Sequence, residues 1–214
     1  MRKFERGYKD PARLMAEAAA CPDPADERRT RLISSLHKRS DADAFLAAAG
    51  AAKAADLELR LVAVEVLGQL GYPSGRPYRE ETLPILLDEL DQAVDPRLLE
   101  AALNALAHLG DGRALTPVLR HAAHRDDRVR RAVAFTLPSI TDQSNPAPEV
   151  AEALMVLSAD TDGGVRDWAT FGLAELLETD SPEVRAALTA RLDDLAAIAD
   201  QARAGLVKRS APGG

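Results

Sequence analysis

The chain has 214 residues, of which 46% are hydrophobic, 29% charged and only 4% aromatic, and its net charge is −7. A buried core must therefore be built mainly from Ala, Leu and Val. No segment approaches the roughly 18 consecutive apolar residues that a membrane-spanning helix needs, and the single Cys21 cannot form an internal disulfide. The charged N-terminus lacks the apolar core of a secretory signal, so we expect a cytoplasmic protein with no membrane partner.

Charge is distributed unevenly along the chain. Residues 1–13 carry five Arg or Lys against two acids, residues 108–131 carry six Arg against three acids, and residues 132–200 carry three Arg against thirteen acids. Affinity for nucleic acid needs cations clustered over most of one face, because binding depends on the phosphates neutralised. A nucleic-acid partner is therefore not expected.

Helices are predicted along the whole chain from apolar residues spaced three and four apart, acidic residues before the first turn, and Gly or Pro at the ends. An Ala-rich helix over 10–20 is interpreted as an N-terminal cap within residues 1–22. A degenerate pair follows at 26–36 and 41–49. Gly110 and Gly112 end one helix clearly, because a left-handed residue is needed there. The remaining helices are predicted at 57–70, 80–92, 95–109, from about 113, 127–140, 148–158, 163–178, 182–194 and 199–209.

One short pattern recurs at the start of every second helix: an acid, a short gap, and Val-Arg or a near relative. Its clear copies are Asp56 to Arg60, Asp126 to Arg130 and Asp162 to Arg166, with degenerate copies at Asp95 and Asp200. The residue at the Val position, here called the marker, is found at 59, 98, 129, 165 and 202, which are 39, 31, 36 and 37 residues apart. A period of this length is typical of a helical-repeat array. We expect the helices that carry the marker to be outer and those that follow to line a concave side.

The segments Asp126 to Leu137, Asp162 to Leu173 and Leu109 to Leu115 resemble HEAT repeats, in the short form found in bacteria and in phycobilisome lyases. The resemblance implies an all-α fold, an α-α superhelix or HEAT-like solenoid of about five to six helical-hairpin repeats. Residues 23–214 would then form one solenoid domain. It also implies that the Asp and Arg residues of the pattern form a ladder between adjacent repeats, so none of them is expected to be catalytic.

Catalytic constellations are missing from the sequence. We find no nucleophile–base pair and no glycine-rich phosphate loop. His121 and His124 are three positions apart and are expected on one face of a helix, but the pair offers too few ligands for zinc. No His is followed by Glu, so the repeated His-Glu pairs of di-iron HEAT-like hydroxylases are absent. Trp168, three residues after a marker, is expected to face the core beside Gly172. We therefore predict no enzyme activity, no catalytic residue, no metal and no cofactor.

The expected function is noncatalytic binding of a protein or peptide, as an adaptor, regulator or scaffold, on the concave face or on a loop edge. Loops that differ between repeats emerge on one edge of such an array and often bind partners. Alternatives are an enzyme-linked role, as a chromophore-lyase accessory or in DNA base processing, and an immunity or inhibitor protein. The residues expected to contact the partner lie in the inserted loop near 71–79 and on a basic ridge: Tyr72, Arg76, Tyr78, Arg79, Arg113, Arg120, His121 and His124. Tyr78, Arg79, Arg120 and His121 among them are expected to be exposed.

Overall fold

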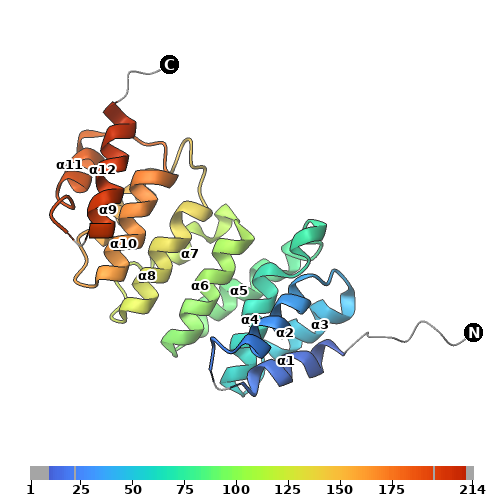
Figure 1. The fold of residues 1–214 in the computed structure, drawn as a ribbon. Helices are drawn as coiled ribbons and strands as arrows, with labels where there is room; N and C mark the ends of the chain where they lie inside the picture. Colours follow the sequence, from blue (N-terminus) through green and yellow to red (C-terminus); the bar gives the residue numbers. More distant parts are fainter. Residues whose placement is uncertain (1–9, 22, 195, 211–214) are drawn as a thin grey trace, which may run out of the picture. The chain divides into compact units, whose positions relative to one another are not determined.

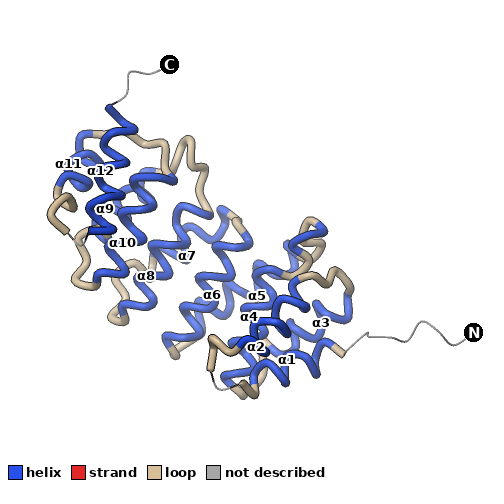
Figure 2. Tube along the Cα trace, viewed as in Figure 1, coloured by secondary structure: helices blue, strands red, loops and turns tan. Residues whose placement is uncertain are grey.

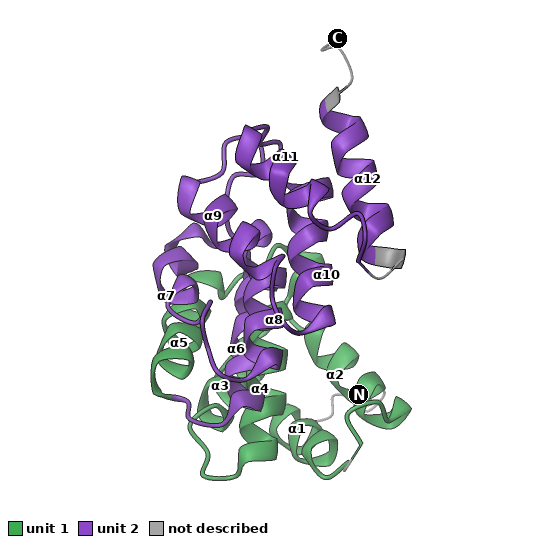
Figure 3. Cartoon of the chain, turned by 90° about the vertical axis from the view of Figure 1, so that its left-hand side faces the viewer, with its two compact units in different colours: residues 1–92 green, residues 93–214 purple. Residues whose placement is uncertain are grey.

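The computed structural model describes residues 10–21, 23–194 and 196–210, and every regular element in these ranges is a helix (Figures 1 and 2). The predicted all-α repeat fold is thus confirmed. The chain divides into two compact units, residues 1–92 and 93–214 (Figure 3). Residues 1–9, which belong to the predicted cap and to the basic N-terminal stretch, lie outside the described residues.

Unit 1 is a bundle built around its first helix. Helix α1 packs against α2, α3 and α4, and α5 packs against α4. Met15 and Ala18 of α1 are completely buried, so the helix interpreted as a cap contributes to the core of this unit. The elements are α1 (Pro11–Ala19), α2 (Glu27–His37), α3 (Ala42–Ala51), α4 (Leu57–Gln69), the 3-10 turn η1 (Tyr72–Ser74) and α5 (Arg79–Gln92).

Unit 2 consists of two layers of helices (Figure 3). The helices that contain the marker pack side by side in chain order and form what we call the marker layer: α6 (Pro96–Leu109), α8 (Asp127–Thr136), α10 (Gly163–Phe171) and α12 (Ala196–Ser210). The second layer lies beside it and contains α7 (Leu115–Leu119), α9 (Pro148–Leu157) and α11 (Pro182–Thr189). Three short non-α segments adjoin these helices: η2 (Gly112–Ala114) leads into α7, η3 (Leu137–Ser139) continues α8, and the π-helical η4 (Gly172–Leu176) continues α10.

The core of unit 2 consists of small and medium side chains, as the composition predicts. Four residues on the inner faces of the marker layer are completely buried: Ala102, Val129, Val133 and Ala169. Close approach follows from this composition: a Cβ added to Gly205 of α12 would lie 2.7 Å from the Cβ of Ala174. Among the described residues, none of the helices has both the length and the hydropathy of a membrane-spanning segment.

Two marker-layer helices end earlier than predicted. The helix expected over 127–140 changes to a 3-10 turn at Leu137, because Pro138 has no N–H to donate and its ring disfavours continued α-helix. The helix expected over 163–178 changes to π-helix at Gly172, where an added Cβ would lie 3.0 Å from Pro138 Cγ. Proline in one helix and glycine in its neighbour thus fit together where the two helices meet.

Arg209 of α12 stabilises the end of the π-helical segment. Its guanidinium donates hydrogen bonds to the carbonyls of Leu173, Ala174, Leu177 and Thr179. The last carbonyls of a helix have no backbone N–H partner within that helix, so the arginine supplies the missing donors. Burial lowers the pKa of this guanidinium, yet arginine remains charged under ordinary conditions.

The acids of the recurring pattern cap the helices that follow them. A side-chain oxygen of Asp56 accepts from Leu59 N at 3.0 Å, and one of Asp162 accepts from Val165 N at 2.9 Å. Such caps satisfy backbone N–H groups that have no partner within the helix. The structural role predicted for these acids is therefore observed.

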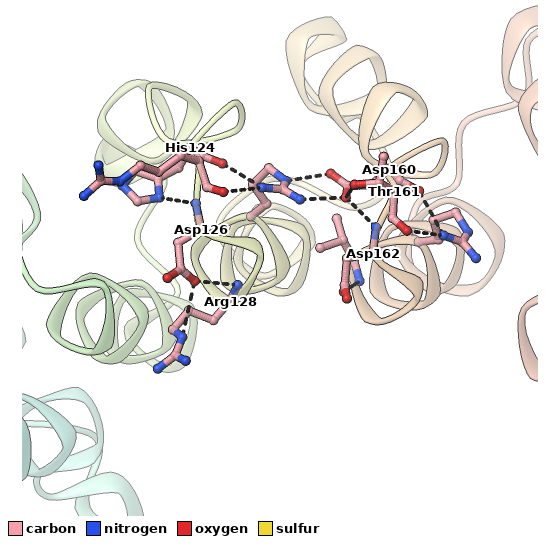
Figure 4. Close-up of polar contacts among 10 residues, drawn as sticks. His124, Asp126, Arg128, Asp160, Thr161 and Asp162 are labelled. Atoms are coloured by element: carbon pink, nitrogen blue, oxygen red, sulfur yellow. Dashed lines mark hydrogen bonds and ion pairs between the residues drawn. The ribbon is translucent and has the colours of Figure 1, made fainter.

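The arginines that follow the markers in α8 and α10 form two equivalent networks, which we call the arginine ladder; Figure 4 shows the one around Asp160. Arg130 donates through Nε and Nη2 to both carboxylate oxygens of Asp160, at 2.7 and 2.8 Å, and Arg166 does the same to Asp194 at 2.7 and 2.9 Å. The third nitrogen of Arg130 donates to the carbonyl of His124 at 2.8 Å, and that of Arg166 to the carbonyl of Asp160 at 2.9 Å. Arg130 therefore joins the loop before α8 to the loop between α9 and α10, and Arg166 joins the loop before α10 to the loop after α11.

The partner of each ladder arginine is not the acid of the recurring pattern. Asp160 lies two positions before the helix-capping Asp162 and also accepts from its backbone N–H at 2.8 Å. In unit 1 the pattern is incomplete: Arg60 pairs with Glu89 of α5 at 2.7 Å, but its Nε is buried without a hydrogen bond. At the marker Leu98 the next residue is the buried Leu99, so a hydrophobic contact stands where the ladder arginine would be.

We expect the variant R130Q to destabilise the protein by about 2–3 kcal/mol, because it leaves the half-buried Asp160 carboxylate without its bidentate partner. The matched control is R128Q, on the same helix. Arg128 is 45% exposed and contacts Asp126 at 3.2 Å, so its loss should change the free energy of unfolding by less than about 0.5 kcal/mol. Urea unfolding followed by circular dichroism measures both, and equal effects would contradict the assigned role.

The contribution of this pair should disappear in acid. The hydrogen bond from Arg130 lowers the pKa of Asp160 below its ordinary value. A carboxyl with a depressed folded-state pKa stabilises the fold at pH values above its unfolded pKa, about 3.9, and loses this effect as the pH falls through the folded value. The difference in unfolding free energy between the wild type and R130Q should therefore be constant from pH 7 to about 5 and shrink below about 4. A difference that stays constant down to pH 2 would show that the pair does not titrate as described.

Candidate functional site

The loop of unit 1 expected to contact a partner is a compact structure closed on itself. Gly71 has φ of +69°, its N–H donates to the carbonyl of His37 at 2.9 Å, and its carbonyl accepts from the N–H groups of Ser74 and Arg76. Gly75 also lies in the left-handed region, with φ of +78°. The two glycines thus let the chain reverse twice between α4 and α5.

The exposed Tyr72 and the half-buried Arg76 form the tip of this loop. Tyr72 is 64% exposed, and the guanidinium carbon of Arg76 lies 5.0 Å from the centroid of its ring, a cation–π contact. Arg76 has φ of +54°, a strained value for a residue other than glycine. Strained residues of this kind gather at functional sites, and the role of this pair in partner binding stays a prediction.

Tyr78 differs from the expectation that it is exposed. Its ring stacks on Phe45 of α3 with centroids 4.7 Å apart and planes 10° apart, and the residue is half-buried. The prediction of a free side chain was wrong, because the loop folds back onto α3 and buries one face of the ring. Arg79, the first residue of α5, is exposed.

The basic ridge predicted in unit 2 does not lie along a helix. Helix α7 ends at Leu119, and the next bonds, such as His121 N–H to the carbonyl of Val118, join residues three apart, as in turns. His121 and His124 are half-buried with ring centroids 6.4 Å apart, while Arg120 is exposed. Their predicted placement on one helix face was therefore wrong.

Two members of the ridge are bound into the fold. Arg113 is exposed but donates to both carboxylate oxygens of the buried Asp111, at 2.9 and 2.8 Å. His124 accepts from the N–H of Asp126 through Nδ1 at 3.1 Å, and its carbonyl accepts from Arg130 (Figure 4). His124 thus belongs to the arginine ladder. The eight predicted residues form two sets of four, one in each unit.

A row of rings on the marker layer of unit 2 was not predicted as a site. Trp168 of α10 lies edge-to-face with Phe135 of α8, centroids 5.0 Å apart, and with Phe171 of its own helix, 6.0 Å apart. His108 of α6 continues the row, 6.2 Å from Phe135. We call these four residues the aromatic row.

Trp168 is 37% exposed, so the expectation that it faces the core was wrong. The same register holds the buried Ala132 in α8, whose small side chain fits under the layer, whereas an indole reaches out to the surface. Gly172 instead faces Pro138 and Leu154. The sequence did contain a signal for the row, since Phe135 and Phe171 both stand six residues after a marker.

Among the described residues, no three His, Cys, Asp or Glu side chains converge in an arrangement that could hold a metal ion. The polar clusters that the structure does form, at Asp111, Asp160 and Asp194, are occupied by arginines. What the surface offers is a set of exposed rings and charges.

Comparisons of the sequence and of the structure with known proteins both point to helical repeats. Residues 83–174 match the family model described as HEAT repeats. The X-ray structure of YibA from Escherichia coli is similar with a TM-score of 0.71 and 20% identity, covering 98% of this chain and 77% of that one. No curated protein matches the sequence.

Two further solved structures share the fold. A designed armadillo repeat protein in complex with the peptide (KR)4 has a TM-score of 0.62 and 14% identity, covering 94% of this chain and 100% of that one. The complex of CpcE and CpcF of phycocyanin lyase from Nostoc has a TM-score of 0.57 and 22% identity, covering 77% of this chain and 99% of that one. Identities this low establish the helical-repeat fold alone.

The two tyrosines of the unit 1 loop should respond differently to truncation. We expect Y78A to destabilise the protein by about 2 kcal/mol, because it removes a ring stacked on Phe45. Y72A should cost less than about 0.5 kcal/mol, since its ring is mostly exposed. Thermal unfolding of the two variants side by side measures this, and an equal loss would mean that the loop is held by Tyr72 as well.

Proposed function

Because this chain is a HEAT-repeat protein, we propose that it is a noncatalytic protein-interaction module, an adaptor or scaffold acting in the cytoplasm. Stacked helical repeats present extended surfaces without requiring a central pocket. The same fold occurs in a designed protein in complex with a peptide, which supports binding of a protein or peptide here.

The observation that carries this proposal is the acidic surplus of unit 2. The three arginines within residues 132–200 are all paired with acids of the same unit: Arg166 and Arg191 with Asp194, and Arg185 with Asp180. Thirteen acids stand against these three arginines in the segment, and arginines outside it pair with two more of them, Arg130 with Asp160 and Arg203 with Asp200. The segment therefore keeps an acidic surplus. Such a surface attracts a positively charged protein patch and repels phosphates, and association through it should slow as salt increases.

The loop of unit 1 supplies a second candidate contact. Tyr and Arg are enriched among the residues that dominate interface energies, and both are present at its tip in Tyr72 and Arg76. Arg79 is exposed on the adjoining helix. We propose that this loop edge contacts the same partner or a second one.

The proposal is tested by affinity capture with the full chain as bait, followed by mass spectrometry at about 50 and 500 mM salt. We expect specific proteins to be retained at low salt and released at high salt, because screening shortens the range of surface electrostatics. The double variant Y72A/R79A serves as a matched bait, since both side chains are exposed and their loss should not unfold unit 1.

Each outcome has a separate meaning. Loss of the retained proteins with the double variant would assign the contact to the loop edge, and their retention would assign it to unit 2. Capture of nothing beyond the background of an unrelated bait would overturn the proposed function.

A further inference from the structure

We propose that the aromatic row of unit 2 is the docking surface for a segment of a partner protein rich in Lys and Arg. The inference rests on the proposed function and adds to it the chemistry of the partner. It starts from the position of the row: His108, Phe135, Trp168 and Phe171 come from three neighbouring helices of the marker layer, and none of the four is buried.

The rings are not needed to fill the core. The inner faces of the same helices are filled by residues such as Val133 and Ala169, which are 0% exposed. The equivalent position in α8, also three residues after the marker, is occupied by the much smaller Ala132. Trp168, 37% exposed, therefore adds apolar and π surface where packing requires only a methyl group.

Acidic groups accompany the rings on α10 and its π-helical continuation. Asp167 adjoins Trp168, and one of its carboxylate oxygens accepts from the Nε2 of Gln201 in α12 at 3.1 Å, which fixes its position. Glu175 follows Phe171 by one turn and is exposed. A cation that meets the faces of these rings would thus also find carboxylates nearby.

Cations on the same helices are already engaged, and Lys208 of the neighbouring α12 donates through Nζ to the carbonyl of Glu175 at 3.4 Å. All three guanidinium nitrogens of Arg166 donate hydrogen bonds, to the carboxylate of Asp194 and to the carbonyls of Asp160 and Thr161. Arg131 of α8 pairs with Glu100 at 3.4 Å. The row is therefore an aromatic surface with an acidic border, and indole attracts ammonium and guanidinium groups more strongly than the other rings do.

Other occupants fit these observations less well. Single-stranded nucleic acid stacks its bases on aromatic side chains, but its phosphates require a positive groove, and here the border is acidic. A purely apolar segment would cover the rings but leave carboxylates such as that of Asp167 facing it. Only a cationic segment uses both features.

Trp168 is the single tryptophan of the chain, so intrinsic fluorescence reports on the row directly. The full chain is titrated with an octapeptide of alternating Lys and Arg, and in parallel with a Glu-rich and a Ser-Gly octapeptide. We expect a saturable change in intensity or emission maximum with the cationic peptide only, and a weaker response at high salt. A saturable response to the Glu-rich peptide, or none to the cationic one, would overturn the proposal.

Variants then locate the contact by anisotropy of a fluorescein-labelled cationic peptide. We expect W168A to weaken binding about tenfold and W168F to weaken it less, because a phenyl ring keeps part of the cation–π attraction. D167N should weaken it about threefold and reduce its salt dependence. The control is V156A, which removes a side chain that is 74% exposed on α9 of the second layer and should leave binding unchanged.

Thermal unfolding of each variant accompanies the binding data, and W168F keeps the test valid if W168A is unstable. Equal binding by W168A, W168F and the wild type would show that the peptide is held elsewhere, and the inference would fall. The bait W168F/D167N distinguishes this failure from failure of the proposed function. If affinity capture with that bait retains the same salt-sensitive proteins, the module function stands and the row is not its site.

Discussion

The pairing of one arginine with one carboxylate across successive loops is the interaction on which the order of unit 2 depends. A guanidinium presents its N–H groups in a rigid plane, so it can hold a carboxylate through two bonds and still donate to carbonyls on another side. Arg130 and Arg166 both use this geometry. A lysine could supply the charge but not the fixed directions, so the loops that these arginines join would lose their defined orientation.

Different residue types stabilise different parts of unit 2, and this leaves its surface positions available for binding. Ala, Val and Leu fill the inner faces, aspartates cap the helices, and arginines hold the loops. The outward positions of the marker layer are then not needed to fill the core, cap the helices or hold the loops. It is in these positions that Phe135, Trp168 and Phe171 stand.

Much of the fold could be predicted from the sequence because its signals are local. Capping aspartates such as Asp126 and Asp162 gave helix starts to within about one residue, and Gly110, with φ of +66°, ends α6 as expected. The errors arise where a distant contact decides. The α-helix changes at Gly172 where it meets Pro138 of the neighbouring helix, and Tyr78 is half-buried against Phe45, which is 33 positions earlier in the chain.

The candidate sites were less predictable for the same reason. Tyr72 and Arg76 were found because they share one loop. The aromatic row joins residues from three helices, and each ring taken alone reads as part of a core. Only the shared register of Phe135 and Phe171 relates them, and register becomes a surface only when the helices lie side by side.

The carbonyl bonds of the ladder carry a consequence for how such a chain changes its length. Arg130 donates to the carbonyls six and five positions before it, and Arg166 does the same. The loop that contains Asp160 therefore offers its carboxylate to Arg130, which precedes it, and its carbonyls to Arg166, which follows it. Removal or duplication of the 36 residues that separate Arg130 from Arg166 would join equivalent loops and leave every guanidinium with its full set of acceptors. Whole repeats could thus be removed or duplicated without the loss of a ladder bond, and the two rungs tolerate different spacings, since Asp160 follows Arg130 by 30 positions and Asp194 follows Arg166 by 28.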